Sequence, residues 1–499
     1  MRALAIALFT TTALLGACSD DDDASGGETG GTSSGGAAGD SAAGAPGTSG
    51  SKPDGGAAGA TAMGLGGAAA GAGGAPSEAR TFTVTIENVA PVRLFTSSGV
   101  FNVPVGDAAP GPATPGKSYE FTIHAGRKQK LSFATMLAAT NDLFYAPSGD
   151  GIALYDEDGE PLSGSVTDQV YLWDAGTEVN EEPRVGASTV SKQAAPNTGP
   201  AENGNVRLIE DTDDIFEYPS VAEVLTVDIT HVAGTEFKVT ISDVSSNMVL
   251  QTSEGDFAAP ISPGVWVVHG GKDPLFTAGM PDRGQGIERI AEDGNPTSLG
   301  AYALANSGVT FPASPGVWAV HAEGQMPLFA DGEPDSEYGV EHIAEDGNPM
   351  SLAEHLATLE GELSSDVFNM PVGADAAGPI TPGKKYQFSF QAVPGQALSF
   401  ATMLAATNDV FFAPADAGIP LFDAEGTPLS GDITSEVRLW DAGTEANEEP
   451  AIGPNTVTNQ PAPNTGEEGE GAVRLLAEVG DDYEYPAVDD VLEVTIRAD

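Results

Sequence analysis

LSFATMLAATND occupies Leu131–Asp142 and recurs, letter for letter, at Leu398–Asp409. Further along the chain, WDAGTE at Trp173–Glu178 recurs at Trp440–Glu445. The interval is the same for both motifs (398 − 131 and 440 − 173 are both 267). An ungapped repeat of this length indicates that one folding unit is used twice.

Outside these motifs, short runs alternate apolar and polar residues, as at Phe82–Ile86 and Phe237–Ile241. Alternation with period two is typical of half-buried strands, and turns such as Thr114–Lys117 separate the runs. The sequence therefore predicts an all-β chain with two tandem antiparallel β-sandwich domains. A single helix is expected, because Ser351 and Glu354 form the pattern of a capping box before a run of leucines.

The composition changes before the repeats begin. Residues 1–18 resemble a signal peptide, with a basic Arg2, an apolar run and small residues before Cys18, the only cysteine. That ending resembles a bacterial lipobox, so we expect lipid attachment at Cys18 and export to the outer membrane or cell surface, with the periplasm as the alternative. Residues 19–79 are rich in Gly, Ala, Ser and Asp and contain no aromatic residue, which predicts a disordered tether.

The repeat places a first domain at residues 80–232 and a second at 236–499. The second contains a further duplication, because SPGVWVVH at Ser262–His269 recurs as SPGVWAVH at Ser314–His321. These strands open two modules, 262–306 and 314–358, and the first domain has neither. Two interpretations stay open: either the first domain is a truncated sandwich, or the module at 262–306 packs onto it.

Charge and motif content exclude several classes of function. The chain carries 73 acidic and 20 basic residues, a formal net charge of −53, which repels nucleic acid and attracts cations. Residues 80–499 contain no GxSxG, HExxH or CxxC motif and no Gly-rich phosphate loop, so we expect no enzyme. We expect His269 and His321, and the four tryptophans of the repeated motifs, to be structural.

The order of motifs SPGVWAVH, PLF, AEDGNP, LSFATMLAATND and WDAGTE resembles the spondin N-terminal domain family in its bacterial form. Residues 236–499 show all five in that order, and residues 80–232 show only the latter part. The resemblance implies an antiparallel β-sandwich like that of calcium-dependent membrane-binding modules. Animal members are extracellular matrix and adhesion proteins. It also implies Ca²⁺ ligands at six positions, namely Asp142, Asp174 and Glu178 in the first copy and Asp409, Asp441 and Glu445 in the second.

The repeated loops suit calcium on chemical grounds too. Calcium takes roughly six to eight oxygen ligands, and a turn at Gly176 would let the acids of the DAGTE loop converge. Converging carboxylates repel one another unless a cation compensates them. Ordinary turns with acids facing water remain an alternative. The acidic pairs of the AEDGN motif, Glu292-Asp293 and Glu345-Asp346, are interpreted as capped turns, with a second cation site as the alternative.

The sequence thus predicts a lipid-anchored cell-envelope protein with two calcium-binding sandwiches. Its expected role is adhesion, to extracellular matrix, polysaccharide or another cell-surface ligand. Two interpretations compete with adhesion. One is a periplasmic or surface lipoprotein that binds a glycan or solute, and the other is a structural envelope protein.

Overall fold

The computed structural model describes residues 78–335, 339–361 and 363–499. Strands dominate these ranges and pair antiparallel, which confirms the all-β, sandwich-like prediction. The predicted leader with Cys18, and all but the last two residues of the predicted tether, lie outside the described residues. Within the described ranges, no helix combines the length and apolar character needed to cross a membrane.

One sandwich, which we call the inserted sandwich, is built from residues 97–305. Its larger sheet has the order β2-β14-β4-β5-β8-β9, with β6 paired to β4, and its smaller sheet has the order β3-β11-β10-β7. Phe133 of the larger sheet and Tyr119 and Val239 of the smaller sheet share one buried core. The strands are β2 (Ser97–Phe101), β3 (Ser118–His124), β4 (Lys130–Leu137), β5 (Leu143–Pro147), β6 (Ile152–Ala153), β7 (Gly164–Ser165), β8 (Val170–Asp174), β9 (Arg207–Leu208), β10 (Leu225–Ala233), β11 (Glu236–Asp243), the hairpin β12 (Leu250–Thr252) and β13 (Gly255–Phe257), and β14 (Ile261–His269).

The other sandwich, the outer sandwich, comprises residues 80–88 and 313–499. Its sheets have the orders β16-β15-β18-β19-β22-β23, with β20 paired to β18, and β17-β1-β24-β21. Trp318 of the first sheet stacks on Phe388 of the second across the core. The strands are β1 (Arg80–Asn88), β15 (Ala313–Ala322), β16 (Ser364–Phe368), β17 (Lys385–Ala392), β18 (Gln396–Leu404), β19 (Val410–Ala413), β20 (Ile419–Pro420), β21 (Gly431–Asp432), β22 (Arg438–Asp441), β23 (Arg474–Leu475) and β24 (Leu492–Ala498).

Each SPGVW module continues into a pair of helices that covers one face of the larger sheet. Helices α2 (Ile287–Asp293) and α3 (Thr297–Ala305) pack on β4 and β2, and α4 (Val340–Asp346) and α5 (Met350–Leu356) pack on β18 and β16. The predicted capping box was wrong, because α5 begins after Pro349 with no side-chain cap, which leaves Ser351 inside its first turn. The remaining helices are short: η1 (Thr167–Gln169), η2 (Ile209–Asp211), α1 (Val221–Val224), η3 (Thr434–Glu436), η4 (Leu476–Glu478) and α6 (Val488–Val491).

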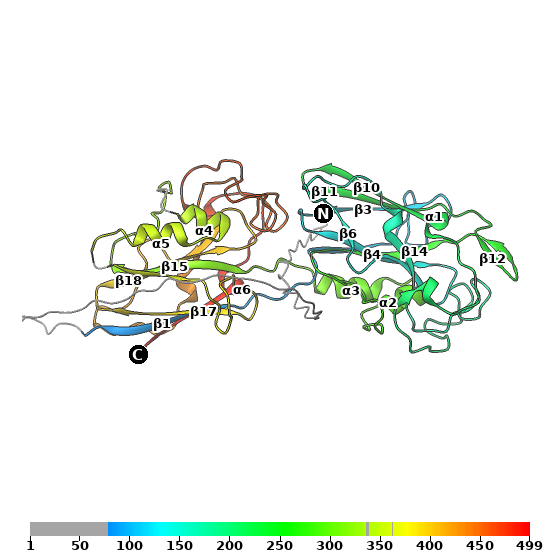
Figure 1. The fold of residues 1–499 in the computed structure, drawn as a ribbon, viewed down its shortest axis with the longest axis horizontal. Coiled ribbons are helices and arrows are strands. Elements are labelled where there is room, and N and C mark those ends of the chain that lie inside the picture. The colour runs from blue at the N-terminus through cyan, green and yellow to red at the C-terminus, as the bar shows by residue number, and fades with distance from the viewer. Residues whose placement is uncertain (1–77, 336–338, 362) are drawn as a thin grey trace, which may run out of the picture. The chain divides into compact units, whose positions relative to one another are not determined.

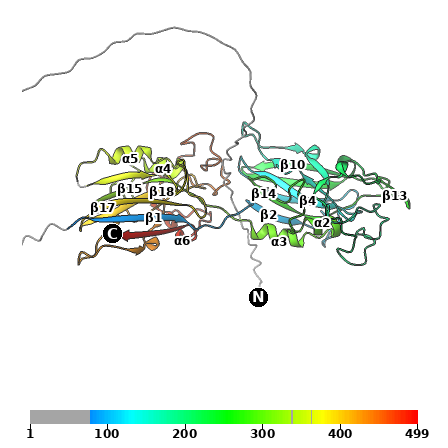
Figure 2. The ribbon, with the colours of Figure 1, turned by 60° about the horizontal axis from the view of Figure 1, so that its bottom comes forward.

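The repeat suggested a domain boundary between residues 232 and 236, but the chain does not divide there. Strand β1 pairs with β17 and β24 of the outer sandwich, and β11 pairs with β3 and β10 of the inserted one. In Figures 1 and 2 the blue β1 accordingly lies among yellow and red strands. The module at 262–306 belongs to the inserted sandwich, because β14 pairs with both β2 and β4. The module at 262–306 therefore packs onto the first repeat, which was the second of the two interpretations.

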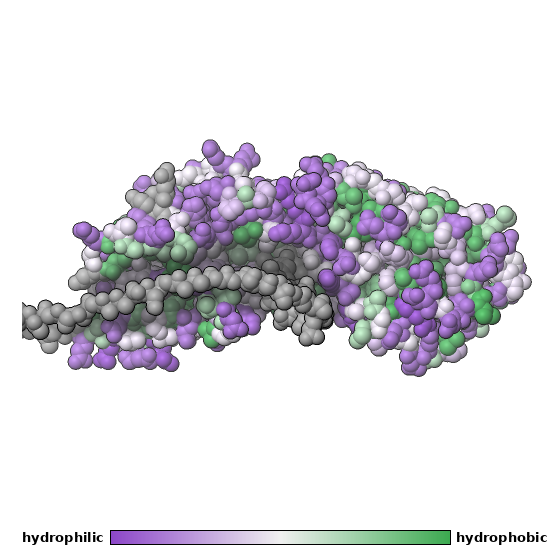
Figure 3. Space-filling model, in the orientation of Figure 1, coloured by the Kyte–Doolittle hydropathy of each residue, from purple (hydrophilic) through white to green (hydrophobic). Residues whose placement is uncertain are grey.

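Sequence similarity between β1 and β11 explains why each can complete a sandwich. Both carry an F-x-V-T-I pattern, which in β1 buries Phe82, Val84 and Ile86. The inserted sandwich starts at the strand equivalent to β16 and ends with its helical module. It is therefore a circular permutation of the outer one, inserted after β1. Hydrophilic residues cover much of the face shown in Figure 3.

The connectivity predicts which fragments fold. A fragment of residues 97–306 should unfold in one cooperative thermal transition, whereas residues 80–232 should not fold. The shorter fragment lacks β11 and β14, and β11 alone buries Phe237, Val239 and Ile241. Each such side chain contributes about 1.5–3 kcal/mol, against a total stability of about 5–15 kcal/mol. Circular dichroism melting of the two fragments tests this, and a cooperative transition in residues 80–232 would contradict it.

Candidate functional site

Strand register brings two predicted ligands together in each sandwich. Leu143 of β5 pairs with Asp174 of β8, so Asp142 and Asp174 lie at the same edge of the sheet. In the outer sandwich, Val410 pairs with Asp441 in the same way. The repeated motifs therefore place two carboxylates side by side at the ends of neighbouring strands.

Asp142 is fully buried, and its carboxylate accepts hydrogen bonds from the backbone of the DAGTE loop. Its Oδ2 accepts hydrogen bonds from the backbone N–H of Thr177 (2.9 Å) and of Glu178 (3.1 Å), and its Oδ1 accepts one from the Thr177 hydroxyl (2.5 Å). Asp409 repeats the two backbone bonds at 2.9 and 3.1 Å and the hydroxyl bond, from Thr444, at 2.7 Å. Each aspartate thus fixes the loop that follows the neighbouring strand.

Asp174 starts that loop and is also fully buried. Its Oδ1 accepts a hydrogen bond from the Gly176 backbone N–H (2.6 Å), and its Oδ2 accepts one from the Asn180 amide (2.7 Å). Gly176 has φ 69°, and a Cβ there would lie 2.6 Å from the backbone oxygen of Asn205. Only glycine fits this turn without displacing the neighbouring backbone.

A third carboxylate joins Asp142 and Asp174, and the sequence did not indicate it. One oxygen of each of Asp142, Asp174 and Glu202 lies within 4.8 Å of the others, the only such group of three or more metal-ligating side chains in the described ranges. Arg207 Nη2 bonds Glu202 Oε1 (2.6 Å) and Asp174 Oδ2 (3.2 Å). Glu202 Oε2 is buried and has no hydrogen-bond partner among the residues described. Arg207 therefore pairs with two of the three acids.

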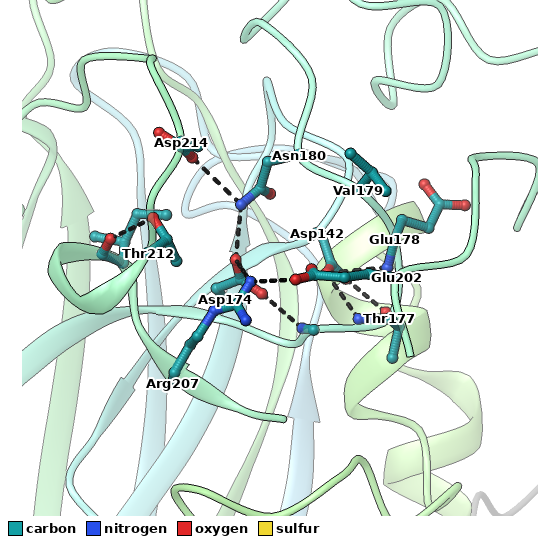
Figure 4. Close-up of polar contacts among 12 residues, drawn as sticks. Asp142, Asp174, Thr177, Glu178, Val179, Asn180, Glu202, Arg207, Thr212 and Asp214 are labelled. Atoms are coloured by element: carbon teal, nitrogen blue, oxygen red, sulfur yellow. Dashed lines mark hydrogen bonds and ion pairs between the residues drawn. The ribbon is translucent and has the colours of Figure 1, made fainter. Parts of the chain in front are cut away.

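The carboxylate of Glu178 lies outside this group, although the sequence placed it there. It points away from Asp174 (Figure 4), where Oε2 accepts from the Asn141 amide (3.2 Å) and Oε1 from the Gly199 backbone N–H (2.6 Å). Glu178 contributes its backbone N–H to Asp142 instead. An open pocket of about 300 Å³, lined in part by Asn180, Glu202 and Arg207, adjoins the acidic group on the side of Glu202.

The outer sandwich repeats the two aspartates without the third acid. The position equivalent to Glu202 is Gly469, 267 residues later. Asp441 Oδ1 lies 3.7 Å from Arg474 Nε, and Glu445 Oε2 accepts from the Asn408 amide (3.1 Å). The two sites are therefore chemically different, although their framework is the same.

Glu292 and Glu345 occupy the last turns of α2 and α4 rather than the capped turns expected from AEDGN. Both are 1% exposed. The Thr177 hydroxyl lies 2.8 Å from Glu292 and 2.5 Å from Asp142. A hydroxyl has one proton and can donate to only one acceptor, so the other contact requires a proton on a carboxyl group or a nearby cation. In the sequence, Glu292 and Glu345 were marked by the repetition of the AEDGN motif.

Burial changes the protonation of these acids. It raises the pKa of Asp142 and of Asp409 well above the usual range, and it raises that of Asp441 to about 6. Burial also raises the pKa of Glu292 and Glu345 to about 8, against the effect of their threonine hydrogen bonds. Removing a carboxylate from water disfavours its charged form, and a bound cation would favour it again.

The repeated histidines lie inside the sandwiches. His269 Nε2 is 2.9 Å from the Ser132 hydroxyl, and its Nδ1 is 2.9 Å from the carbonyl oxygen of Gly271. His321 makes the same contact with Ser399 at 2.9 Å. His269 and His321 are fully buried, and burial lowers the pKa of each, so both rings are neutral hydrogen-bonding groups of the fold.

The sequence matches no protein-family model and no curated protein. The group of Asp142, Asp174 and Glu202 offers oxygen atoms alone. Such a set fits hard cations such as Ca²⁺ and Mg²⁺, whereas zinc sites in proteins usually include nitrogen or sulfur ligands.

The buried glutamates predict how metal-free protein responds to pH. Their usual pKa is 4.5 and the folded values are about 8, so between these values the folded state binds more protons than the unfolded state. Stability should therefore fall as pH rises through this range, by at most about 1.4 kcal/mol per pH unit for each group. Glu292→Gln with Glu345→Gln should flatten the pH dependence, measured as Tm in chelator. The exposed Glu354→Gln is the control; equal slopes in all three proteins would contradict this assignment.

Proposed function

We propose that the inserted sandwich binds a calcium ion through Asp142, Asp174 and Glu202. The observation that carries this proposal is the convergence of three carboxylate oxygens within 4.8 Å of one another. Asp142 immediately precedes β5, Asp174 is the last residue of β8, and Glu202 lies on the loop before β9. Calcium would hold this edge of the sheet together by joining three separate segments.

The charges of the group favour a divalent ion. Three carboxylates and one guanidinium leave a formal charge of −2 when all the acids are ionised. Asp142 and Asp174 are fully buried, where unbalanced charge is costly. The unpartnered Oε2 of Glu202 supplies a free ligand atom, and Glu202 also lines the adjoining pocket.

Calcium is the better candidate than magnesium, because the ligands come from three separate segments of the chain. Magnesium demands near-ideal octahedral geometry, whereas calcium accepts about six to eight oxygens in irregular arrangements. With three carboxylates, one of them engaged by arginine, we expect weak affinity, with a Kd on the order of 0.1–1 mM as in extracellular modules.

The wider role we propose is that of a lipid-anchored surface protein whose two sandwiches take part in calcium-assisted adhesion. Three features of the sequence support it: the leader that ends at Cys18, the tether of residues 19–79, and the motif order that resembles spondin domains. Extracellular matrix, polysaccharide and other cell-surface ligands are the partners we consider. We expect no enzymatic activity. A glycan- or solute-binding lipoprotein and a structural envelope protein are the competing roles.

Calorimetric titration of residues 19–499 with Ca²⁺ tests the metal proposal. Asp174→Asn should abolish one binding event, and Glu202→Gln should weaken it by about tenfold or more, because each removes a charged ligand. Asp441→Asn, the matched change in the outer sandwich, should leave that event intact. Unchanged heats in Asp174→Asn would contradict the site.

The adhesion proposal predicts calcium-dependent binding to an immobilised partner. Residues 19–499 should bind one or more polysaccharides or matrix proteins on an array, and chelator should remove this binding. Asp174→Asn should reproduce the effect of chelator at saturating calcium. Binding that ignores both chelator and this substitution would favour the structural or solute-binding roles.

A further inference from the structure

A hollow of about 410 Å³ lies in the outer sandwich and is formed in part by the loop of residues 482–486. Three aromatic residues and three acids line it, namely Phe311, Tyr483, Tyr485, Glu449, Asp482 and Glu484. Phe311 packs into the core of this sandwich and is 7% exposed, whereas Tyr483 is 39% exposed. We call this hollow the tyrosine–acid pocket, because it combines a partly open aromatic ring with negatively charged residues.

The three acids of the pocket have no partner within the described ranges. No hydrogen bond or ion pair joins the carboxylate of Glu449, Asp482 or Glu484 to another residue there. Glu449 is half-buried, and burial raises the pKa of its carboxyl group, against the effect of the nearby imidazole of His124. An unbalanced charge is costly at a half-buried carboxylate, so a cation in the pocket would stabilise it.

Further acids are gathered around Tyr483. Burial raises the pKa of its hydroxyl, and so do the charges of Glu448, Glu449, Asp481 and Asp482. Asp481 is held in place, because its Oδ2 accepts a hydrogen bond from the Tyr485 hydroxyl (3.0 Å) and its Oδ1 accepts one from the Tyr483 backbone N–H (3.1 Å). The electrostatic potential at this ring is therefore negative, which attracts a cation and repels an anion.

The inserted sandwich differs at the equivalent positions, 267 residues earlier in the chain. Ile215 stands in place of Asp482. Glu182, the equivalent of Glu449, accepts hydrogen bonds from the backbone N–H of Ser253 (2.5 Å) and from its hydroxyl (2.8 Å). The carboxylate that is free in the outer sandwich is thus already satisfied in the inserted one, which supplies a matched control.

The arrangement of the pocket suits an organic cation better than a metal ion. The one group of three or more acids in the described ranges whose oxygens all lie within 4.8 Å of one another does not include the acids of this pocket. The hollow is also much larger than a metal ion. Half of the six residues named above are aromatic, and the face of an aromatic ring attracts an ammonium group within about 6 Å.

A neighbouring hollow indicates how the ligand continues. This second open hollow, of about 620 Å³, shares Tyr483 and Tyr485 with the pocket and is lined also by Leu475, Val488 and Arg438. Its apolar side chains suit a hydrocarbon group, and the guanidinium of Arg438 repels a second cation. A single ammonium group on an apolar stem, with apolar neighbours, matches both hollows.

We propose that the tyrosine–acid pocket binds a lysine side chain of a partner protein, with its ammonium group among Glu449, Asp482 and Glu484. The aliphatic stem of that lysine would lie against Tyr483, and an apolar residue next to it would enter the neighbouring hollow. This site belongs to the outer sandwich, goes beyond the proposed calcium binding and does not depend on it.

Calorimetric titration of residues 19–499 tests the proposal, with a capped short peptide that carries one lysine flanked by leucines as the probe. We expect binding at about 0.15 M salt, where charges more than about 8 Å apart are largely screened. Tyr483→Ala should weaken it about three- to thirtyfold, and Tyr483→Phe should retain it, because the ring face is the binding element. Glu449→Gln should weaken binding, whereas the matched change Glu182→Gln should not.

Two further probes identify the group that is recognised. The same peptide with an acetylated lysine should not bind, because acetylation removes the charge. Spermidine, a polyamine without apolar neighbours, should bind more weakly than the peptide; tighter binding of spermidine would overturn the assignment to a protein side chain. Thermal melting of each variant shows that it is folded.

The outcomes separate this proposal from the calcium site. Asp174→Asn should leave peptide binding unchanged, and Tyr483→Ala should leave the calcium heats unchanged, so either proposal can fail alone. Equal peptide affinity in the unmodified, Tyr483→Ala and Glu449→Gln proteins would show only diffuse attraction to an acidic surface and would overturn the pocket. Failure of the lysine peptide to bind the unmodified protein would overturn it as well.

Discussion

A buried aspartate that binds the backbone of a neighbouring loop is the interaction on which each site depends. Asp142 and Asp409 have no contact with solvent, yet each accepts hydrogen bonds from two successive backbone N–H groups and a threonine hydroxyl. These bonds compensate the buried carboxylate and set the course of the DAGTE loop. The loop in turn positions Asp174 or Asp441 beside the first aspartate. Substitution of the buried acid would therefore affect the loop and the cation site together.

The same threonine connects the sheets to the helical modules. Thr177 and Thr444 lie between the buried aspartate and a glutamate in the last turn of α2 or α4. The module that the sequence left unassigned is thus part of the acidic region and not an accessory surface element. Strands β1 and β11 follow the same rule, because β1 completes the outer sandwich and β11 completes the inserted one. Each sandwich needs one F-x-V-T-I strand and one SPGVW module, and the chain supplies these components in permuted order.

Much of the fold followed from the sequence because repeats and alternation report strand pairing directly. The proximity of Asp142 to Asp174 followed only from the family resemblance, which implied that both are ligands; in the structure it arises because Leu143 pairs with Asp174. Strand exchange could not be predicted, because β1 and β11 carry nearly the same pattern and either could complete either sandwich. Glu202 was missed because no repeat marks it: Gly469 takes its place in the second copy. The side-chain direction of Glu178 depends on donors from Asn141 and Gly199, which local sequence does not reveal.

The two sandwiches therefore share a framework of two buried aspartates. They differ in the third acid, which is Glu202 in the inserted sandwich and is replaced by Gly469 in the outer one. Anomalous diffraction from crystals of residues 19–499 grown with Tb³⁺, a luminescent substitute for calcium, would test this difference most directly. We expect a peak among Asp142, Asp174 and Glu202, with ligand distances of about 2.3–2.6 Å. A well-ordered site without a peak, with Arg207 still bridging Asp174 and Glu202, would show that the arginine alone balances these carboxylates.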